Sequence, residues 1–147
     1  MRIRAGEINI RKVQPEDYEA TLSLIRQIPG QNRWRFDGTG FGQTFESLVK
    51  GEAQEAYVAT LRQRVIGFVS LYYMRVLHHG GMVASIQELV VTEELRGRGI
   101  GRALVDFAKA RAEELRCSGF ELATSLPNLG RRLHAWRDCG QNQQLMT

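Results

Sequence analysis

Cysteine is scarce in this chain of 147 residues, which has only two, and neither belongs to a CxxC motif. Cys117 and Cys139 have no histidine partner at the spacing of a metal site, so we expect no metal centre. Two unpaired thiols are typical of a reducing compartment, and we therefore expect a cytoplasmic protein.

Long apolar runs and long basic blocks are also absent. No apolar run approaches the roughly 18 residues of a membrane-spanning helix, and no apolar stretch follows the basic residues Arg2 and Arg4. We therefore expect neither a membrane segment nor a secretory signal. The net charge is +4, yet no run of Lys and Arg is long enough for a nucleic-acid-binding arm. A small anionic ligand accounts for this mild excess at least as well.

Hydrophobic periodicity divides the chain into strands and helices. Runs rich in β-forming residues predict five strands, at residues 8–13, 56–61, 65–76, 82–91 and 120–124. Apolar residues at helical spacing predict four helices, which carry Tyr18 to Ile28, Phe45 to Val49, Ile100 to Leu115, and Leu129 to Trp136.

Proline and glycine mark the helix ends. Pro15 opens the first helix and Pro29 follows its last turn, ahead of a loop at residues 31–42. Gly51 ends the short second helix, and Gly119 closes the long third one. The resulting order, β-α-α-β-β-β-α-β-α, predicts one α/β domain over residues 1–147. We expect a mixed, largely antiparallel central sheet flanked by helices, with a parallel strand–helix–strand unit.

One segment carries the chemistry, a glycine-rich turn between the fourth strand and the third helix. Glycines at 97, 99 and 101 allow close approach of a ligand to the backbone. Unpaired N–H groups at the helix N-terminus then converge on one spot, where they bind phosphate. Arginines at 96, 98 and 102 add positive charge and donors. The turn is neither a P-loop, which needs Gly-Lys-Ser/Thr, nor a GxGxxG dinucleotide motif.

The pattern Arg96-Gly97-Arg98-Gly99-Ile100-Gly101 resembles the acyl-CoA pyrophosphate loop of the GNAT superfamily of N-acyltransferases. The flanking segments ELVVTEELRG and GIGRALVDFAKARAEE are similar to the fourth strand and third helix of that family. The strand order also matches over about residues 7–140. The resemblance implies an acyl-CoA-dependent N-acetyltransferase with acetyl-CoA as cosubstrate and no metal.

In this family an amine attacks the acyl-CoA thioester directly within a ternary complex, which implies a primary amine acceptor on a small molecule or peptide. Backbone groups of the fourth strand pair with pantetheine and bind the oxyanion. By position, the cofactor-binding residues are expected to be Leu89, Val90, Val91, Arg96, Gly97, Arg98, Gly99, Ile100, Gly101, Arg102 and Asn128. Leu89 and Val91 also suit the core, and Asn128 equally suits a helix N-cap.

Two positions are expected to be catalytic. Glu88 lies among apolar residues beside the expected thioester, where a carboxylate with a raised pKa acts as a base, although a solvated carboxylate fits the pattern too. At the position of Trp136 the family often has a Tyr that acts as the general acid. An indole N–H cannot give up a proton, so Trp136 cannot take that role. Trp136 is then expected to pack on the pantetheine arm. His134 is an alternative proton donor, or its side chain merely faces solvent.

The acceptor side and the C-terminus remain open. The family builds its acceptor wall from the segment that here holds Trp34, Phe36, Asp37 and Phe41, residues that equally suit a core under a loop. Residues 141–147 are polar where relatives continue with further strands, so we expect a shortened final strand region and a possible homodimer. Two alternative functions are a CoA-binding regulatory or sensor domain and, more distantly, a nucleic-acid-binding module.

Overall fold

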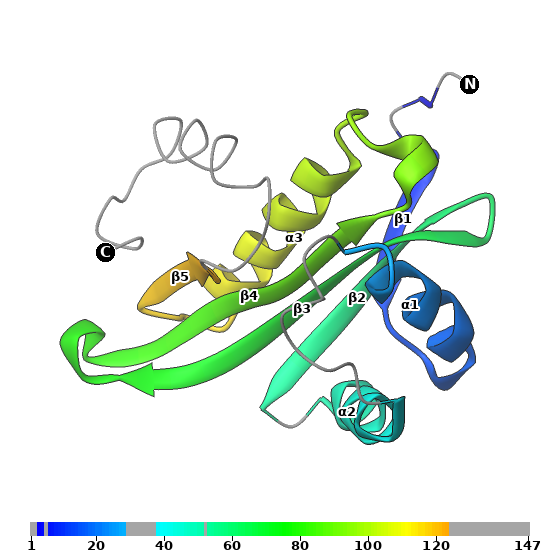
Figure 1. Cartoon of the computed structure of the whole chain (residues 1–147). Coiled ribbons are helices and arrows are strands. Elements are labelled where there is room, and N and C mark those ends of the chain that lie inside the picture. The colour runs from blue at the N-terminus through cyan, green and yellow to red at the C-terminus, as the bar shows by residue number, and fades with distance from the viewer. Residues whose placement is uncertain (1–2, 5, 29–37, 52, 124–147) are drawn as a thin grey trace.

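The computed structural model describes residues 3–4, 6–28, 38–51 and 53–123. Its centre is a five-stranded sheet in the order β1-β2-β3-β4-β5 (Figure 1). The strands are β1 (Ile8–Lys12), β2 (Gln54–Leu61), β3 (Arg64–Val76), β4 (Gly81–Val91) and β5 (Gly119–Leu122). Every neighbouring pair is antiparallel except β4 and β5, which are parallel. The predicted α/β fold with a largely antiparallel sheet is confirmed.

Helices cover both faces of this sheet. The helices α1 (Tyr18–Ile25) and α2 (Gly38–Lys50) lie on one face, and α3 (Ile100–Glu114) lies on the other (Figure 1). Two hydrophobic clusters follow this division, one beneath α3 and one beneath α1 and α2. Short 3-10 turns precede α1 (Pro15–Asp17), join β3 to β4 (Leu77–His79) and follow β4 (Glu93–Leu95). The two buried layers result from the period-two alternation of the strands.

Helix α2 starts earlier than the sequence predicts. The loop prediction for residues 31–42 is wrong from Gly38 onward, because α2 already begins there. Phe41 stacks on Phe45 with ring centroids 6.1 Å apart, and Tyr18 packs edge-on against both rings. This packing outweighs the poor helix propensity of the glycines. Phe41 therefore belongs to the core, whereas residues 29–37 lie outside the described residues.

The end of α3 also differs from the expectation. Arg116 takes a left-handed conformation with φ of 57°, and its N–H bonds to the Glu113 carbonyl at 3.0 Å. The Cys117 N–H bonds to the Ala112 carbonyl at 3.0 Å, which completes a Schellman motif without glycine. The helix therefore ends at Glu114, before Gly119, and Leu115 is 44% exposed and not part of the apolar face. The predicted last helix lies outside the described residues.

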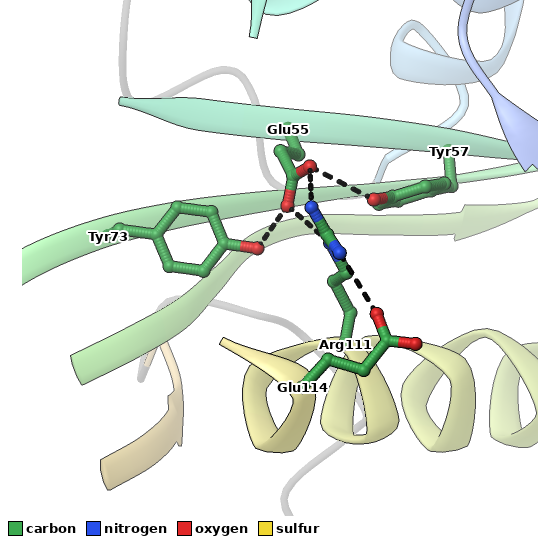
Figure 2. A network of polar contacts seen from close by, with 5 residues as sticks. All are labelled: Glu55, Tyr57, Tyr73, Arg111 and Glu114. Carbon is green, nitrogen blue, oxygen red and sulfur yellow. Dashed lines mark hydrogen bonds and ion pairs between the residues drawn. The ribbon is translucent and has the colours of Figure 1, made fainter. Parts of the chain in front are cut away.

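A buried polar network ties α3 to the sheet (Figure 2). Glu55 on β2 is 8% exposed and accepts two hydrogen bonds from Arg111 on α3, both at 3.0 Å. The phenols of Tyr57, at 3.2 Å, and Tyr73 donate to the same carboxylate. Burial alone would raise the pKa of Glu55, but the hydrogen bonds from Arg111 and Tyr73 outweigh it and hold this pKa below its usual value. Glu114 accepts a further bond from Arg111 at 2.9 Å.

Candidate active site

The glycine-rich turn has the backbone that a phosphate cradle needs. Gly97 and Gly99 have φ of 78° and 86°, a left-handed conformation that side chains with a β-carbon rarely adopt. A β-carbon at either position would meet no described atom within 4 Å, so the conformation and not crowding favours glycine there. Gly99 caps α3, and the first bond within the helix runs from the Ala103 N–H to the Gly99 carbonyl at 3.0 Å. The earlier N–H groups have no helical carbonyl to bind, so the turn fits an anion.

The three arginines of this turn have different surroundings. Arg96 donates from Nε to the Val91 carbonyl at 3.0 Å and from Nη2 to the Gln27 carbonyl at 3.3 Å. The Gln27 side chain accepts the Glu93 N–H at 2.9 Å. Arg96 and Gln27 therefore brace the turn against β4 and the end of α1. Arg98 and Arg102 are exposed beside the glycines.

Strand β4 loses its neighbour β5 halfway along. Their pairing runs as far as Ile86 opposite Leu122, and the Ala123 N–H donates to the Ile86 carbonyl at 2.9 Å. Beyond that point no described strand pairs with residues 87–91 on this side. We call this open edge the β4 gap. The Glu88 and Thr92 N–H groups bond to Ser70 and Ile66 of β3.

Strand alternation then decides which backbone groups face the β4 gap. Since Glu88 and Thr92 point their N–H groups toward β3, Val90 does the same, whereas Leu89 and Val91 point theirs into the gap. The Val91 carbonyl is already bonded to Arg96. A ligand in the gap would therefore meet the backbone of Leu89 first.

A β-bulge sets the face on which Glu88 lies. Ser70 pairs with Glu88 and Leu71 with Ile86, so Gln87 is an extra residue without an opposite partner. Ile86 and Leu89 both pack in the cluster under α3. Glu88 therefore lies on the other face, which α1 and α2 cover.

Glu88 is a partly buried carboxylate whose one hydrogen-bonding side chain among the described residues is Ser70. Burial raises its pKa, and the hydrogen bond from the Ser70 hydroxyl opposes this only in part. Tyr72 lies on the same face, where burial and the charge of Glu88 raise its pKa to about 12. A carboxylate with a raised pKa and no cationic partner can accept a proton near neutral pH.

The described part of the chain thus brings most of the predicted site residues onto one continuous segment. Glu88 and residues 89–91 lie on β4, and residues 96–102 follow directly. The other three expectations, Asn128, His134 and Trp136, lie outside the described residues. So do Trp34, Phe36 and Asp37 of the expected acceptor wall.

Sequence reasoning missed Ser70, Tyr72, Gln27 and Gln87. A serine inside the apolar run from Val69 to Leu71 was a usable signal, because a buried hydroxyl needs a partner. Gln27 carries no recognisable pattern, since it acts only through contacts with a segment far along the chain.

Comparison with known proteins shows the family of the chain. A sequence model described as the acetyltransferase (GNAT) family matches residues 18–140. The chain belongs to the GNAT family of acetyltransferases. An aminoalkylphosphonate N-acetyltransferase of Salmonella typhimurium is 30% identical to this GNAT chain over 123 residues, covering 84% of this chain and 76% of that protein.

Two further relatives extend the comparison. The D-amino-acid N-acetyltransferase HPA3 of Saccharomyces cerevisiae is 29% identical over 112 residues, covering 74% of this chain and 69% of that protein. The crystal structure of an aminoglycoside N-acetyltransferase, AAC(6')-Iy in complex with CoA, superposes with a TM-score of 0.74. It is 17% identical and covers 97% of this chain and 93% of its own, so the likeness shows the GNAT fold alone.

The described residues contain neither a candidate metal site nor a helix that could span a membrane. They contain no group of three or more His, Cys, Asp or Glu side chains that could hold a metal ion. The rings of His78 and His79 lie 4.5 Å apart in the turn between β3 and β4. None of the helices in this part of the chain is long and apolar enough to cross a membrane.

Proposed function

We propose that this GNAT protein transfers the acetyl group of acetyl-CoA to the primary amine of a small molecule that also carries an acidic group. One observation carries the proposal: a single segment holds a partly buried carboxylate at Glu88, the open backbone of the β4 gap and the glycine cradle. These are the three parts that amine acetylation needs, namely a proton acceptor, an oxyanion donor and a phosphate site.

The substrate class rests on the curated relatives. Both are named for amines that carry an anionic group, an aminoalkylphosphonate in one case and a D-amino acid in the other. The net charge of +4 suits an anionic acceptor as well as CoA. We therefore place amino acids and aminophosphonates first among the acceptors.

The reaction follows from these parts. The amine nitrogen attacks the thioester carbonyl carbon, the C–N bond forms, the C–S bond breaks, and the CoA thiolate leaves. The Glu88 carboxylate accepts the proton that the amine loses, directly or through water. The Leu89 N–H, which points into the β4 gap, is our candidate oxyanion donor. The N-terminus of α3, with Arg98 and Arg102 beside it, would hold the pyrophosphate.

The first experiment combines calorimetry and turnover. Acetyl-CoA is titrated into the wild type and into Gly99→Glu, and release of free CoA is followed with a panel of amino acids, aminophosphonates and neutral amines. We expect micromolar binding by the wild type, its loss in the variant, and turnover with acidic amines first. The carboxylate at position 99 strains the positive φ and repels phosphate. Turnover only with neutral amines would overturn the substrate class.

The same measurement separates the enzyme from a CoA-binding sensor. Tight acetyl-CoA binding without CoA release from any amine in the panel would support the sensor. No binding by the wild type would overturn both functions.

A further inference from the structure

Ser70, on β3, is the described side chain that holds Glu88. We infer that Ser70 is a positioning residue of the acetyl transfer: its hydroxyl fixes the Glu88 carboxylate in one orientation, so that the second carboxylate oxygen stays available to the acceptor amine. This inference rests on the proposed function, in which Glu88 is the base.

Two hydrogen bonds between Ser70 and Glu88 close a ring. The Ser70 hydroxyl donates its single proton to Glu88 Oε1 and accepts the Glu88 backbone N–H at 3.0 Å. Ser70 is fully buried, with 0% exposure, so water does not compete for either bond. Both bonds go to one residue, and the carboxylate cannot rotate away without breaking one of them.

The β-bulge explains why a serine stands in this apolar strand. In a regular antiparallel ladder, a β3 carbonyl would accept the Glu88 N–H. Here, at the register shift, the Ser70 hydroxyl accepts this N–H. The hydroxyl thus satisfies a buried backbone donor and orients the side chain of the same residue.

No described cation faces the Glu88 carboxylate. Tyr72 on β3 is the described titratable group whose pKa the charge of Glu88 raises, and the only described side chain that shifts the pKa of Glu88 is Ser70. Charged residues of the covering elements pair with one another, as Arg11 with Asp17 and Lys50 with Glu46. The sheet-facing residues of α2 include Phe45 and Leu48, which are apolar. The Ser70 hydroxyl is therefore the described group that stabilises the ionised form, and its loss should make that form harder to reach.

The chain offers a matched control in Ser85. Ser85 is also 0% exposed, lies on the same face between Ala84 and Ile86, and accepts a hydrogen bond from the Gln87 side chain at 2.9 Å. At low pH, kcat/KM should fall as Glu88 becomes protonated, and we call this part of the pH profile the acid limb. In Ser70→Ala we expect the acid limb to move to higher pH. On the acid side of the limb, kcat/KM should fall about tenfold. Ser85→Ala should leave the limb in place; equal profiles for both variants would overturn the inference.

A double-mutant cycle separates positioning from general damage to the fold. Because Ser70 acts through Glu88, adding Ser70→Ala to Glu88→Gln should cause no further loss of kcat/KM. A further tenfold loss would mean that Ser70 acts independently, and the inference would fail. If Ser70→Ala does not fold, Ser70→Thr and Ser70→Val form a second pair that differs in the hydroxyl alone; only the Val variant should shift the limb.

Failure of the underlying function is distinguishable in the same data. If Glu88→Gln keeps the acid limb of the wild type, Glu88 is not the base. If Glu88→Gln abolishes the limb but Ser70→Ala leaves it unmoved, only the role of Ser70 is wrong.

Discussion

Two glutamates of this protein occur in similar local sequences and have opposite surroundings. Gln54-Glu55 and Gln87-Glu88 each open or continue an apolar strand segment of the same sheet. Glu55 is buried and Glu88 is partly buried. Glu55 lies under α3, where Arg111 and two phenols bind it. Glu88 lies on the face covered by α1 and α2, where Ser70 alone donates a hydrogen bond from a described side chain.

The difference shows how the partners of a carboxylate decide its role in this sheet. Arg111 neutralises Glu55 and holds its pKa below the usual value, so Glu55 stays ionised and fastens α3 to β2 and β3. Glu88 has no such partner, and burial raises its pKa. One carboxylate is therefore committed to structure, and the other is available to exchange protons.

The largest expected effect is on catalysis. Glu88→Gln should reduce kcat/KM by about 10²- to 10⁴-fold, the usual contribution of a general base, while acetyl-CoA binding by calorimetry stays close to that of the wild type. Glu55→Gln removes a carboxylate of the same kind and should lower kcat/KM far less. Equal losses in the two variants would remove the catalytic distinction between the two sites.

The next largest effect is on stability, where Glu55→Gln should be more damaging than Glu88→Gln. Glu55→Gln leaves the Arg111 charge with only the exposed Glu114 carboxylate and should cost about 2 to 3 kcal/mol in the free energy of unfolding. This lies below the usual cost of breaking a fully buried pair, because Arg111 is partly exposed. Glu88→Gln removes a partly buried charge that has no cationic partner among the described residues, and should be neutral or slightly stabilising at pH 7. Urea unfolding of both variants measures this, and a marked destabilisation by Glu88→Gln would contradict it.

The pH dependence of unfolding should also have opposite signs. The folded-state pKa of Glu55 is lowered, so its stabilisation is present above the pKa of the unfolded state and is lost as pH falls through the folded value. The folded-state pKa of Glu88 is raised, so stability falls as pH rises through that value. A series of urea titrations at different pH should show the acid-side loss shrink in Glu55→Gln. The loss on rising pH should shrink in Glu88→Gln.

The smallest effect comes from a single phenol. Tyr73→Phe removes one hydrogen bond to Glu55 and should cost about 1 to 2 kcal/mol. Tyr72→Phe removes the same atom from the neighbouring residue on the opposite face and should change stability by about 0.5 kcal/mol or less. Thermal unfolding compares the two, and equal losses would mean that the bond to Glu55 contributes nothing.

The sequence predicted the five strands because a run of β-forming residues can be recognised without knowledge of its partners. The glycine turn was also visible, since its spacing and its place between strand and helix are local. Other features depended on contacts between distant segments. Helix α2 reaches back to Gly38 because Phe41 packs on Tyr18, and α3 ends at a left-handed Arg116 with no glycine to announce it.

The distinction between the two glutamates could not be predicted for the same reason. No pattern near Glu55 in the sequence indicates that its partner is Arg111, which follows 56 residues later. The face of Glu88 depends on an extra residue in β4, which is defined only by the register with β3. Alternation counted along β4 alone would have turned Glu88 toward α3.

The bulge at Gln87 also bears on how this strand tolerates length changes in evolution. In a regular strand, losing one residue reverses the facing of everything that follows, which a two-sided core does not survive. Here Glu88 would follow Ile86 directly and still oppose Ser70, because the residue removed is the one without a partner. A variant that lacks Gln87 should therefore fold with its core intact, and β4 is a place where relatives can differ by one residue in mid-strand.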